Sequence, residues 1–444
     1  MLPHIRPLRL LILLLLVLAG CRQAENGPES AALATPEQLT GPVETVSAAP
    51  SPTPAREAVP TPAPAGVNRL ILWTSADFAP RSELPGGQLL GDQLAVFGQN
   101  NPDLALEVQL KALTGQGGTL SYLRTGRTVA PTILPDLVLL STDQLPTATN
   151  DRLIYPIEQY LSAAMLDDLY PAAESLVQFD NHIMGYPFAM TGLHHLAYSR
   201  SVITETLPVT WTGLVQLEEA SFIFPASGLE GAELVLHLYL AAGGSLVNEA
   251  GQPDLQVEPL TIALSQIGRG RGSGLISLQS SSVTSLAEAW QLFQNGVSSL
   301  VQTRSTIFLA QDGLANNWGY APLPGIEQAA VPQVKSWVWA VSTPDPARQA
   351  KAVELIAWLT APENLGPWGA SSYILPARRS ALESWTAPAD YLAFVDGELE
   401  RAQPYPAAAA SVIMNAFSEA VFDVVTLAAT PQLAAQRAAE AVRP

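Results

Sequence analysis

The feature that most limits the fold of this chain is a regular alternation of strand and helix patterns in its first apolar stretch. Residues 69–73 form a short apolar run typical of a buried strand, and residues 88–99 carry apolar side chains at helical spacing. Alternating apolar residues at 104–110 predict a second strand, residues 119–125 a short helix, and the apolar run 137–140 a third strand. This series favours a parallel sheet with helical crossovers, whose ligands gather beyond the carboxyl ends of the strands.

The stretch 181–200 predicts a passage from one α/β lobe to a second one. It opens with a turn signal that ends at Gly185, and Pro187 then favours extended backbone at Tyr186. The mostly apolar residues that follow are typical of a strand, and strand and helix patterns both precede and follow this stretch. At 444 residues the chain is also too long for one ordinary core. We therefore expect two lobes joined by a hinge.

The first residues lie outside this pattern and predict a secretory signal peptide. A cationic start is followed by the apolar run 10–18 and by Leu-Ala-Gly-Cys at 18–21, whose small residues are typical of a cleavage site. The apolar run is too short to span a bilayer comfortably. Cys21 is the only cysteine, so no disulfide can form within one chain.

Residues 22–67 differ in composition from everything that follows them. They are rich in proline, alanine, threonine, serine and glutamate, and contain two proline-rich runs at 49–54 and 60–64. Such a segment has too few apolar side chains to build a core, and its prolines favour an extended, solvated backbone. We therefore expect a signal peptide over residues 1–20, a disordered tether over 21–67, and folded lobes from residue 68.

The charge balance limits the classes of partner. The net charge is −18, from 22 basic and 40 acidic residues. An acidic surface excludes nucleic acid as a partner. It also argues mildly against general anion binding, although a local basic cluster could override it.

Motifs for catalysis, metal binding or phosphate binding are scarce. The chain has no Gly-x-Ser-x-Gly, no His-Glu-x-x-His and no glycine-rich phosphate loop ending in Gly-Lys-Ser/Thr. His194 and His195 are adjacent on a predicted strand, so they point to opposite faces and are poorly placed to bind one ion. The alternating glycines and arginines of 268–272 are interpreted as a solvated basic loop that could hold an anion. We expect neither a metal site nor a cofactor.

Tryptophan is the most informative residue type. Five tryptophans lie near predicted strand ends or lobe junctions: Trp73, Trp211, Trp318, Trp337 and Trp339. Any one of them is more typical of a core residue than of a ligand platform. Several rings facing one cleft would suit a sugar, whose apolar face stacks on aromatic rings while polar side chains bind its hydroxyls.

Several short motifs occur in a set order along residues 70–442. They include Pro135-Asp136-Leu137-Val138, Gly185-Tyr186-Pro187-Phe188-Ala189, Pro208-Val209-Thr210-Trp211, Gly243-Gly244-Ser245-Leu246-Val247-Asn248 and Ala321-Pro322-Leu323-Pro324-Gly325. In this order and spacing the chain resembles the extracellular solute-binding proteins of family 1, the maltose-binding-like lipoproteins of ABC importers. The residues at 18–21 resemble a bacterial lipobox, which implies lipidation of Cys21.

The resemblance implies an α/β fold of the two-lobe periplasmic-binding-protein type (type II, Venus-flytrap). Each lobe would be a mainly parallel sheet flanked by helices, and three hinge crossings would join the lobes. The second crossing would fall near 301–305 and the third near 341–343. The implied lobes are residues 68–187 plus 303–342 (N-terminal) and residues 188–302 plus 343–444 (C-terminal).

The resemblance also implies a set of ligand-binding residues in the cleft between the lobes. Carried over position by position, they are Trp73, Thr74, Ser75, Ser141, Thr142, Phe188, Gly244, Ser245, Arg304 and Trp339. One departure concerns a late helix in which related sugar binders carry several rings. Here the corresponding residues are Ala416-Phe417-Ser418-Glu419, in which Phe417 is the only ring, and this argues against a maltodextrin-type stacking platform.

Together these observations predict an extracytoplasmic solute receptor rather than an enzyme. We expect a monomer that binds a carbohydrate by hinge closure, delivers it to the permease subunits of an ABC importer, and is anchored to the bacterial cell membrane through Cys21. Three alternatives remain open. The same fold could bind a polyol phosphate or another small anion through Arg304, or through Arg269 and Arg271. It could instead serve as a sensory or structural lipoprotein with a protein partner, or as a surface hydrolase with an Asp/Glu pair.

Overall fold

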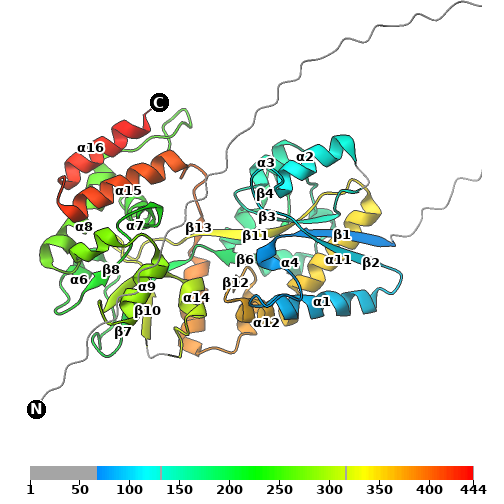
Figure 1. The fold of residues 1–444 in the computed structure, drawn as a ribbon, viewed down its shortest axis with the longest axis horizontal. Coiled ribbons are helices and arrows are strands. Elements are labelled where there is room, and N and C mark those ends of the chain that lie inside the picture. Colours follow the sequence, from blue (N-terminus) through cyan, green and yellow to red (C-terminus); the bar gives the residue numbers. More distant parts are fainter. Residues whose placement is uncertain (1–67, 131–132, 316–317, 444) are drawn as a thin grey trace, which may run out of the picture. The chain divides into compact units, whose positions relative to one another are not determined.

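The computed structural model describes residues 68–130, 133–315 and 318–443 (Figure 1). All helices and strands named below belong to one compact unit, residues 63–444. The predicted signal peptide, the predicted lipidation site Cys21 and the predicted tether lie outside the described residues. Within the described ranges, no helix combines the length and the apolar character needed to cross a membrane.

The first sheet has seven strands in the order β12-β6-β11-β3-β1-β2, with β13 paired to β11. Its strands are β1 (Arg69–Thr74), β2 (Ala105–Leu110), β3 (Leu137–Ser141), β6 (Tyr186–Thr191), β11 (Gln333–Val341), β12 (Leu375–Pro376) and β13 (Gln403–Pro404). Its main helices are α1 (Gly87–Asn100), α2 (Thr119–Val129), α3 (Leu145–Asn150), α11 (Pro346–Thr360), α12 (Pro362–Ser372), α13 (Arg379–Glu383) and α14 (Ala389–Glu400). The short helices α4 (Ala163–Asp167) and α5 (Pro171–Ser175) lie between β3 and β6 in the chain.

The strands and the first helix predicted within residues 69–141 form, and their burial agrees with the apolar patterns that predicted them. All residues of β1 after Arg69 are buried, as are all residues of β3 before Ser141, as expected of strands covered on both faces. Helix α1 buries Leu90, Leu94 and Phe97, which share one face at helical spacing. Strand β1 pairs in parallel with both β2 and β3, as the strand–helix–strand series predicts.

The second sheet has four strands in the order β10-β7-β9-β8. These are β7 (His194–Ser199), β8 (Phe222–Ile223), β9 (Leu300–Arg304) and β10 (Trp318–Pro322). The helices of this part are α6 (Trp211–Val215), α7 (Leu229–Ala241), α8 (Val257–Ser273), α9 (Leu286–Gln294), α10 (Ser305–Ala310), α15 (Ser411–Thr426) and α16 (Pro431–Val442). Its core centres on Trp211, Phe224 and Phe417, all fully buried.

The α/β class is confirmed, but the strand directions are more mixed than the mainly parallel sheets that we expected. Strand β11 is antiparallel to β3 and β6, and β7 is antiparallel to β9 and β10. A crossover helix between neighbouring strands enforces parallel pairing. Strand β11 enters the first sheet from the second one without such a crossover, so this constraint is absent.

The chain passes three times between the part built on the first sheet and the part built on the second. Strand β6 belongs to the first sheet and β7 to the second, and only Gly192 and Leu193 separate them. Gly192 has a φ of 82°, a left-handed conformation that glycine adopts without strain. The stretch 181–200 therefore holds two long strands and the passage between them.

The other two passages between these parts differ in place from the predicted lobe boundaries. Strand β10 pairs with β7, so the return to the first sheet follows Pro322 and not 301–305. After β11 the chain stays with the first sheet, because β12 pairs with β6 and β13 with β11. Helix α15 then packs on α7, so the last change lies between Pro404 and Ser411 and not near 341–343.

Residues 268–272 are helical, which corrects our interpretation of them as a solvated loop. They form the last turns of α8, where Gly268 faces Pro431 and Gly270 faces Ile276. Because glycine has no side chain, the backbone of α8 can lie close to Pro431 and Ile276. This packing overrides the low helix propensity of glycine. Arg271 Nε donates a hydrogen bond to the carbonyl oxygen of Val425 at 3.1 Å.

An ion pair fixes the segment after β12 to the segment before α5. Arg378 Nε lies 2.6 Å from an Asp168 carboxylate oxygen, and Arg378 Nη1 donates to the Thr360 carbonyl oxygen at 2.7 Å. Burial raises the pKa of the Asp168 carboxyl, but hydrogen bonds from Ser380 and Arg378 outweigh it and hold this pKa below its usual value.

Candidate functional site

The carboxyl ends of β1 and β3 meet at one edge of the first sheet. Because Trp73 pairs with Val138 in parallel register, Thr74 and Ser141 both lie toward this end of their strands. Strand β11 runs antiparallel to β3 and places Trp337 opposite Ser141. We call the resulting group the first-sheet edge; its members are Thr74, Ser75, Ser141, Thr142, Asp143, Lys335 and Trp337.

The predicted hydroxyl residues do lie together at this edge, but most of them bind the protein itself. Thr74 Oγ1 donates to the Phe78 carbonyl oxygen at 3.3 Å, and Thr142 Oγ1 accepts from a backbone N–H at 3.2 Å. Ser141 Oγ lies 3.4 Å from Gln144 Oε1. The Ser75 hydroxyl is buried and has no partner among the described residues. Since buried polar groups are normally paired, Ser75 is the predicted hydroxyl with capacity left for a ligand.

Trp73 is buried, and one of its neighbours is a cation. The ammonium nitrogen of Lys111 lies 4.6 Å from the Trp73 ring centroid and 5.2 Å from that of Tyr122. The two rings are 6.3 Å apart in an edge-to-face arrangement. A face of Trp73 is therefore taken by Lys111 through a cation–π contact, and the partly exposed partner ring is Tyr122.

Phe188 and Trp339 belong to the hydrophobic core beside the first sheet and are not surface residues. Their rings stack at 5.0 Å with an interplanar angle of 13°, and both are less than 5% exposed. Trp368 and Phe78 complete this aromatic cluster. Trp337, two residues before Trp339 in β11, is only partly buried and lies 5.1 Å from the Phe78 ring. Trp337 therefore links this aromatic cluster to the first-sheet edge, of which it is a member.

A small pocket lies beside the loop that follows β1. Its volume is about 160 Å³. It is lined by Asp77, Phe78 and Ala79 of that loop, by residues at the start of α1, and by Trp368 and Ser372 of α12. The aromatic cluster thus borders open space on the side of the sheet where the first-sheet edge lies.

Arg304 lies at the end of β9, in the second sheet, opposite His194 of β7. Its guanidinium forms an ion pair with Glu230 at the start of α7. Burial lowers the pKa of the Arg304 guanidinium, and its Nε has no hydrogen-bond partner among the described residues. The Glu230 carboxylate neutralises this arginine, so it does not offer a free positive charge to an anion.

Gly244 and Ser245 form the turn after α7, where they support Tyr239. A β-carbon at Gly244 would lie 2.3 Å from the Tyr239 ring. The Tyr239 hydroxyl donates to the Ser245 carbonyl oxygen at 2.5 Å and accepts from the Gln256 N–H at 3.0 Å. The structure thus gives these two residues a packing role and does not bring them to the first-sheet edge.

A chain of polar contacts that the sequence did not predict runs from the first-sheet edge to α7. Lys335 Nζ lies 2.8 Å from an Asp143 carboxylate oxygen and 4.2 Å from the Tyr405 ring centroid. The Tyr405 hydroxyl donates to Glu233 Oε1 at 3.1 Å. Burial raises the pKa of the Glu233 carboxyl against the opposing effects of Tyr405 and Lys335. No spacing signal links these four residues, because they meet only through the fold.

The two adjacent histidines point in different directions, as the strand geometry predicts. His194 Nδ1 lies 3.2 Å from Gln302 Nε2, whereas the His195 ring packs edge-on against Phe308. Burial lowers the pKa of both imidazoles, that of His195 to about 4. In the part of the chain that the structure describes, no group of three or more potential metal ligands comes together.

Comparisons with known proteins bear on this arrangement. Residues 97–394 match the family described as bacterial extracellular solute-binding proteins. Comparison with curated proteins gives no significant match.

Three solved structures illustrate the similarity of fold. The cyclic α-maltosyl-1,6-maltose-binding protein of Arthrobacter globiformis aligns with a TM-score of 0.66 at 14% identity, covering 85% of this chain and 98% of that one. A cyclo/maltodextrin-binding protein complexed with maltotetraose gives 0.67 at 17% identity, covering 85% and 97%. The sugar-binding protein MalE of Xanthomonas citri gives 0.68 at 20% identity, covering 84% and 96%. At these identities the likeness establishes the two-lobe periplasmic-binding-protein fold.

Proposed function

The chain belongs to the bacterial extracellular solute-binding protein family, and from this premise we propose that it is the carbohydrate receptor of an ABC importer. The solute binds between the two lobes at the first-sheet edge and is delivered to the permease subunits. Movement about the three passages between the sheets closes the lobes over it. The similar structures of proteins that bind maltodextrin or another sugar support the choice of ligand class.

The observation that carries the proposal is the grouping of one partly exposed ring with polar groups at the first-sheet edge. Trp337 supplies an aromatic face, on which the apolar side of a sugar ring stacks. The Lys335–Asp143 pair supplies groups that bind sugar hydroxyls, and the buried Ser75 hydroxyl, which lacks a partner among the described residues, lies behind them at the same end of the sheet. A cleft with a few polar groups beside an aromatic surface is the usual form of such a site.

The geometry weakens the competing proposal of an anion receptor. Arg304 is paired with Glu230, and Arg271 donates to a backbone carbonyl on α15. Both would have to leave these partners to clamp a phosphate. We therefore retain the carbohydrate as the proposed ligand.

The attachment of the protein to the membrane is a further part of this proposal. Its support is the position of Cys21 after an apolar run and before a proline-rich tether. A lipid on Cys21 would hold the receptor outside the cytoplasm, near the permease. Replacement of Cys21 by alanine is expected to release the protein into the soluble extracytoplasmic fraction, and retention of the variant in the membrane fraction would contradict lipid anchoring.

The experiment that tests the receptor proposal is a thermal-shift screen of residues 63–444 against mono-, di- and oligosaccharides. A ligand that binds only the folded state raises its melting temperature. The affinity of the best sugar is then measured for Trp337→Ala, for which we expect a loss of about tenfold from the missing ring contact. Trp318→Ala, which removes a partly buried ring of the second lobe, is the matched control and should bind normally. Absence of a shift with every carbohydrate would overturn the ligand class and favour a protein partner.

A further inference from the structure

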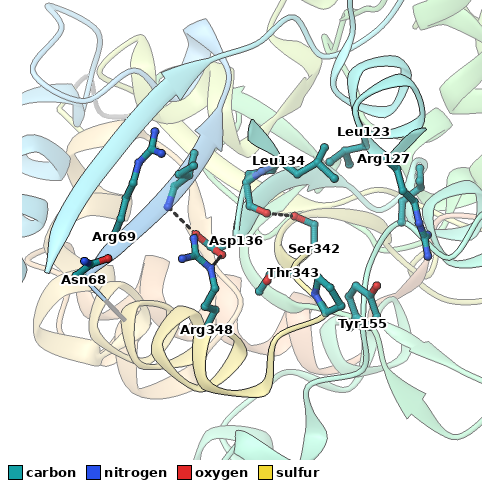
Figure 2. A pocket seen from close by; sticks show the side chains of 14 residues that line it. Asn68, Arg69, Leu123, Arg127, Leu134, Asp136, Tyr155, Ser342, Thr343 and Arg348 are labelled. Atoms are coloured by element: carbon teal, nitrogen blue, oxygen red, sulfur yellow. Dashed lines mark hydrogen bonds and ion pairs between the residues drawn. The ribbon is translucent and has the colours of Figure 1, made fainter. Parts of the chain in front are cut away.

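A second, larger pocket lies at the opposite edge of the first sheet (Figure 2). Its volume is about 440 Å³, within the range of small-molecule sites. It is bordered by Arg69 at the start of β1, Asp136 just before β3 and Ser342 just after β11. The first-sheet edge lies at the other ends of these strands, so the two places are separate.

This pocket is basic in a chain that is acidic as a whole. Three arginines line it, Arg69, Arg127 and Arg348, together with one carboxylate, Asp136. In Figure 2, Arg69 and Arg348 lie on one side of the view and Arg127 on the other, with Ser342 and Thr343 between them. Only 22 of the 444 residues are basic, so three around one pocket is a local concentration of arginine, although carboxylates pair with Arg69 and Arg348.

Two of the arginines are held by carboxylates that use part of each guanidinium. Arg348 donates through Nε and Nη2 to Asp136 at 2.6 and 2.5 Å. Arg69 donates through Nε and Nη2 to a single oxygen of Glu107. In each case Nη1 has no hydrogen-bond partner among the residues that the structure describes.

Arg127 differs from the other two arginines. Its Nη1 donates to the Arg152 carbonyl oxygen, and no carboxylate within the described ranges forms an ion pair with it. Its neighbour on the exposed side of α2, Arg124, does have such a partner in Asp151. No carboxylate of the described residues thus neutralises the charge of Arg127, and its contact with the Arg152 carbonyl holds the guanidinium beside the pocket.

The remaining wall of the pocket is apolar. Ile71, Leu123 and Leu153 are buried, and Leu134 is partly buried beside them. Of these residues, Leu134 leaves part of its apolar surface open to the pocket. Burying it against an apolar stem would be favourable.

We propose that this pocket binds a small organic anion, a carboxylate carried on a short apolar stem. The carboxylate lies against Arg127, the arginine of this pocket without a carboxylate partner among the described residues, because a guanidinium matches the planar geometry of a carboxylate. The Nη1 of Arg348, whose charge Asp136 already neutralises, adds a hydrogen bond. The stem packs on Leu123, Leu134 and Leu153. Occupation of this pocket is independent of the solute at the first-sheet edge and goes beyond the proposed receptor function.

The test measures binding of hexanoate to the full-length protein by isothermal titration calorimetry at low ionic strength. Hexanol is the uncharged probe of the same length, and inorganic phosphate is the anion without a stem. We expect hexanoate to bind at least about tenfold more tightly than either, since it alone makes both a charge-assisted contact and an apolar one. A sugar identified by the thermal-shift screen should leave hexanoate affinity unchanged.

Variants then locate the site. Arg127→Gln should weaken hexanoate by about tenfold, as expected for loss of a charged hydrogen bond. Arg124→Gln on the same helix is the matched control and should bind normally, because Asp151 already neutralises that arginine. Leu134→Trp keeps every cation and fills the apolar side, so it should also weaken hexanoate. Equal binding by the wild type and both pocket variants, equal affinity for phosphate and hexanoate, or no binding of hexanoate would each overturn the proposal.

Discussion

Replacing Asp136 by asparagine is expected to be among the most destabilising single changes of a charged residue in the first lobe. Asp136 is almost completely buried just before β3. Its carboxylate accepts two hydrogen bonds from Arg348 of α11 and a third, at 2.8 Å, from the Ile71 N–H of β1. This one side chain therefore joins β1, β3 and α11.

The magnitude follows from these three contacts. Asparagine can keep one acceptor for Ile71, but its amide N–H groups face the N–H donors of Arg348. Breaking a buried ion pair costs about 3–5 kcal/mol, because the remaining charge is left unpaired. The Arg348 side chain is 29% exposed, so water can solvate part of its charge. We therefore expect the lower end of that range, about 3 kcal/mol.

The measurement is urea unfolding of residues 63–444, followed by tryptophan fluorescence. Asp423→Asn is the control, because its partner Arg437 is 57% exposed and such a pair contributes less than about 1 kcal/mol. The double variant Asp136→Asn with Arg348→Gln removes both charges and should cost less than the sum of the two single changes. A cost for Asp136→Asn similar to that of the control, or full additivity in the double variant, would refute the reasoning.

Three further predictions concern Asp168, Glu233 and Gly244. The lowered pKa of the Asp168 carboxyl stabilises the folded state above the unfolded pKa, near 4, and this stability is lost as the pH falls through the folded pKa. The destabilisation by Asp168→Asn should therefore shrink in unfolding experiments below about pH 4. The pKa shift of Glu233 has the opposite sign, because burial raises the pKa of its carboxyl. Glu233→Gln should therefore raise the melting temperature at pH 8, and this gain should disappear as acid protonates the wild type. A gain independent of pH would contradict the burial argument. Gly244→Ala should lower the melting temperature, because the added methyl group meets the Tyr239 ring, while leaving sugar affinity unchanged; a selective loss of affinity would return Gly244 to the binding site.

The fold could be predicted where local patterns and tertiary contacts agree. The first three strands and α1 follow directly from apolar runs and helical spacing, and the passage at Gly192 lies inside the stretch that the sequence marks as a boundary. Helix α8 was missed because its glycines indicate a loop locally, and only the packing of Gly268 against Pro431 shows why they are there. The later changes of sheet depend on which strands pair across more than a hundred residues, and no local signal specifies that pairing.

The candidate site shows the same limit at the level of single side chains. A parallel sheet predicts that Ser75 and Ser141 lie at one edge, and they do, because this follows from strand direction alone. Which tryptophan reaches that edge does not follow from alternation, because Trp337 and Trp339 share a face of β11. Trp339 stacks on Phe188 and is 2% exposed, whereas Trp337 lies opposite Ser141 at the end of β3 and is only partly buried. Depth along a strand therefore decides whether an aromatic residue serves the core or a ligand, and it depends on register with neighbours that the sequence of β11 does not contain.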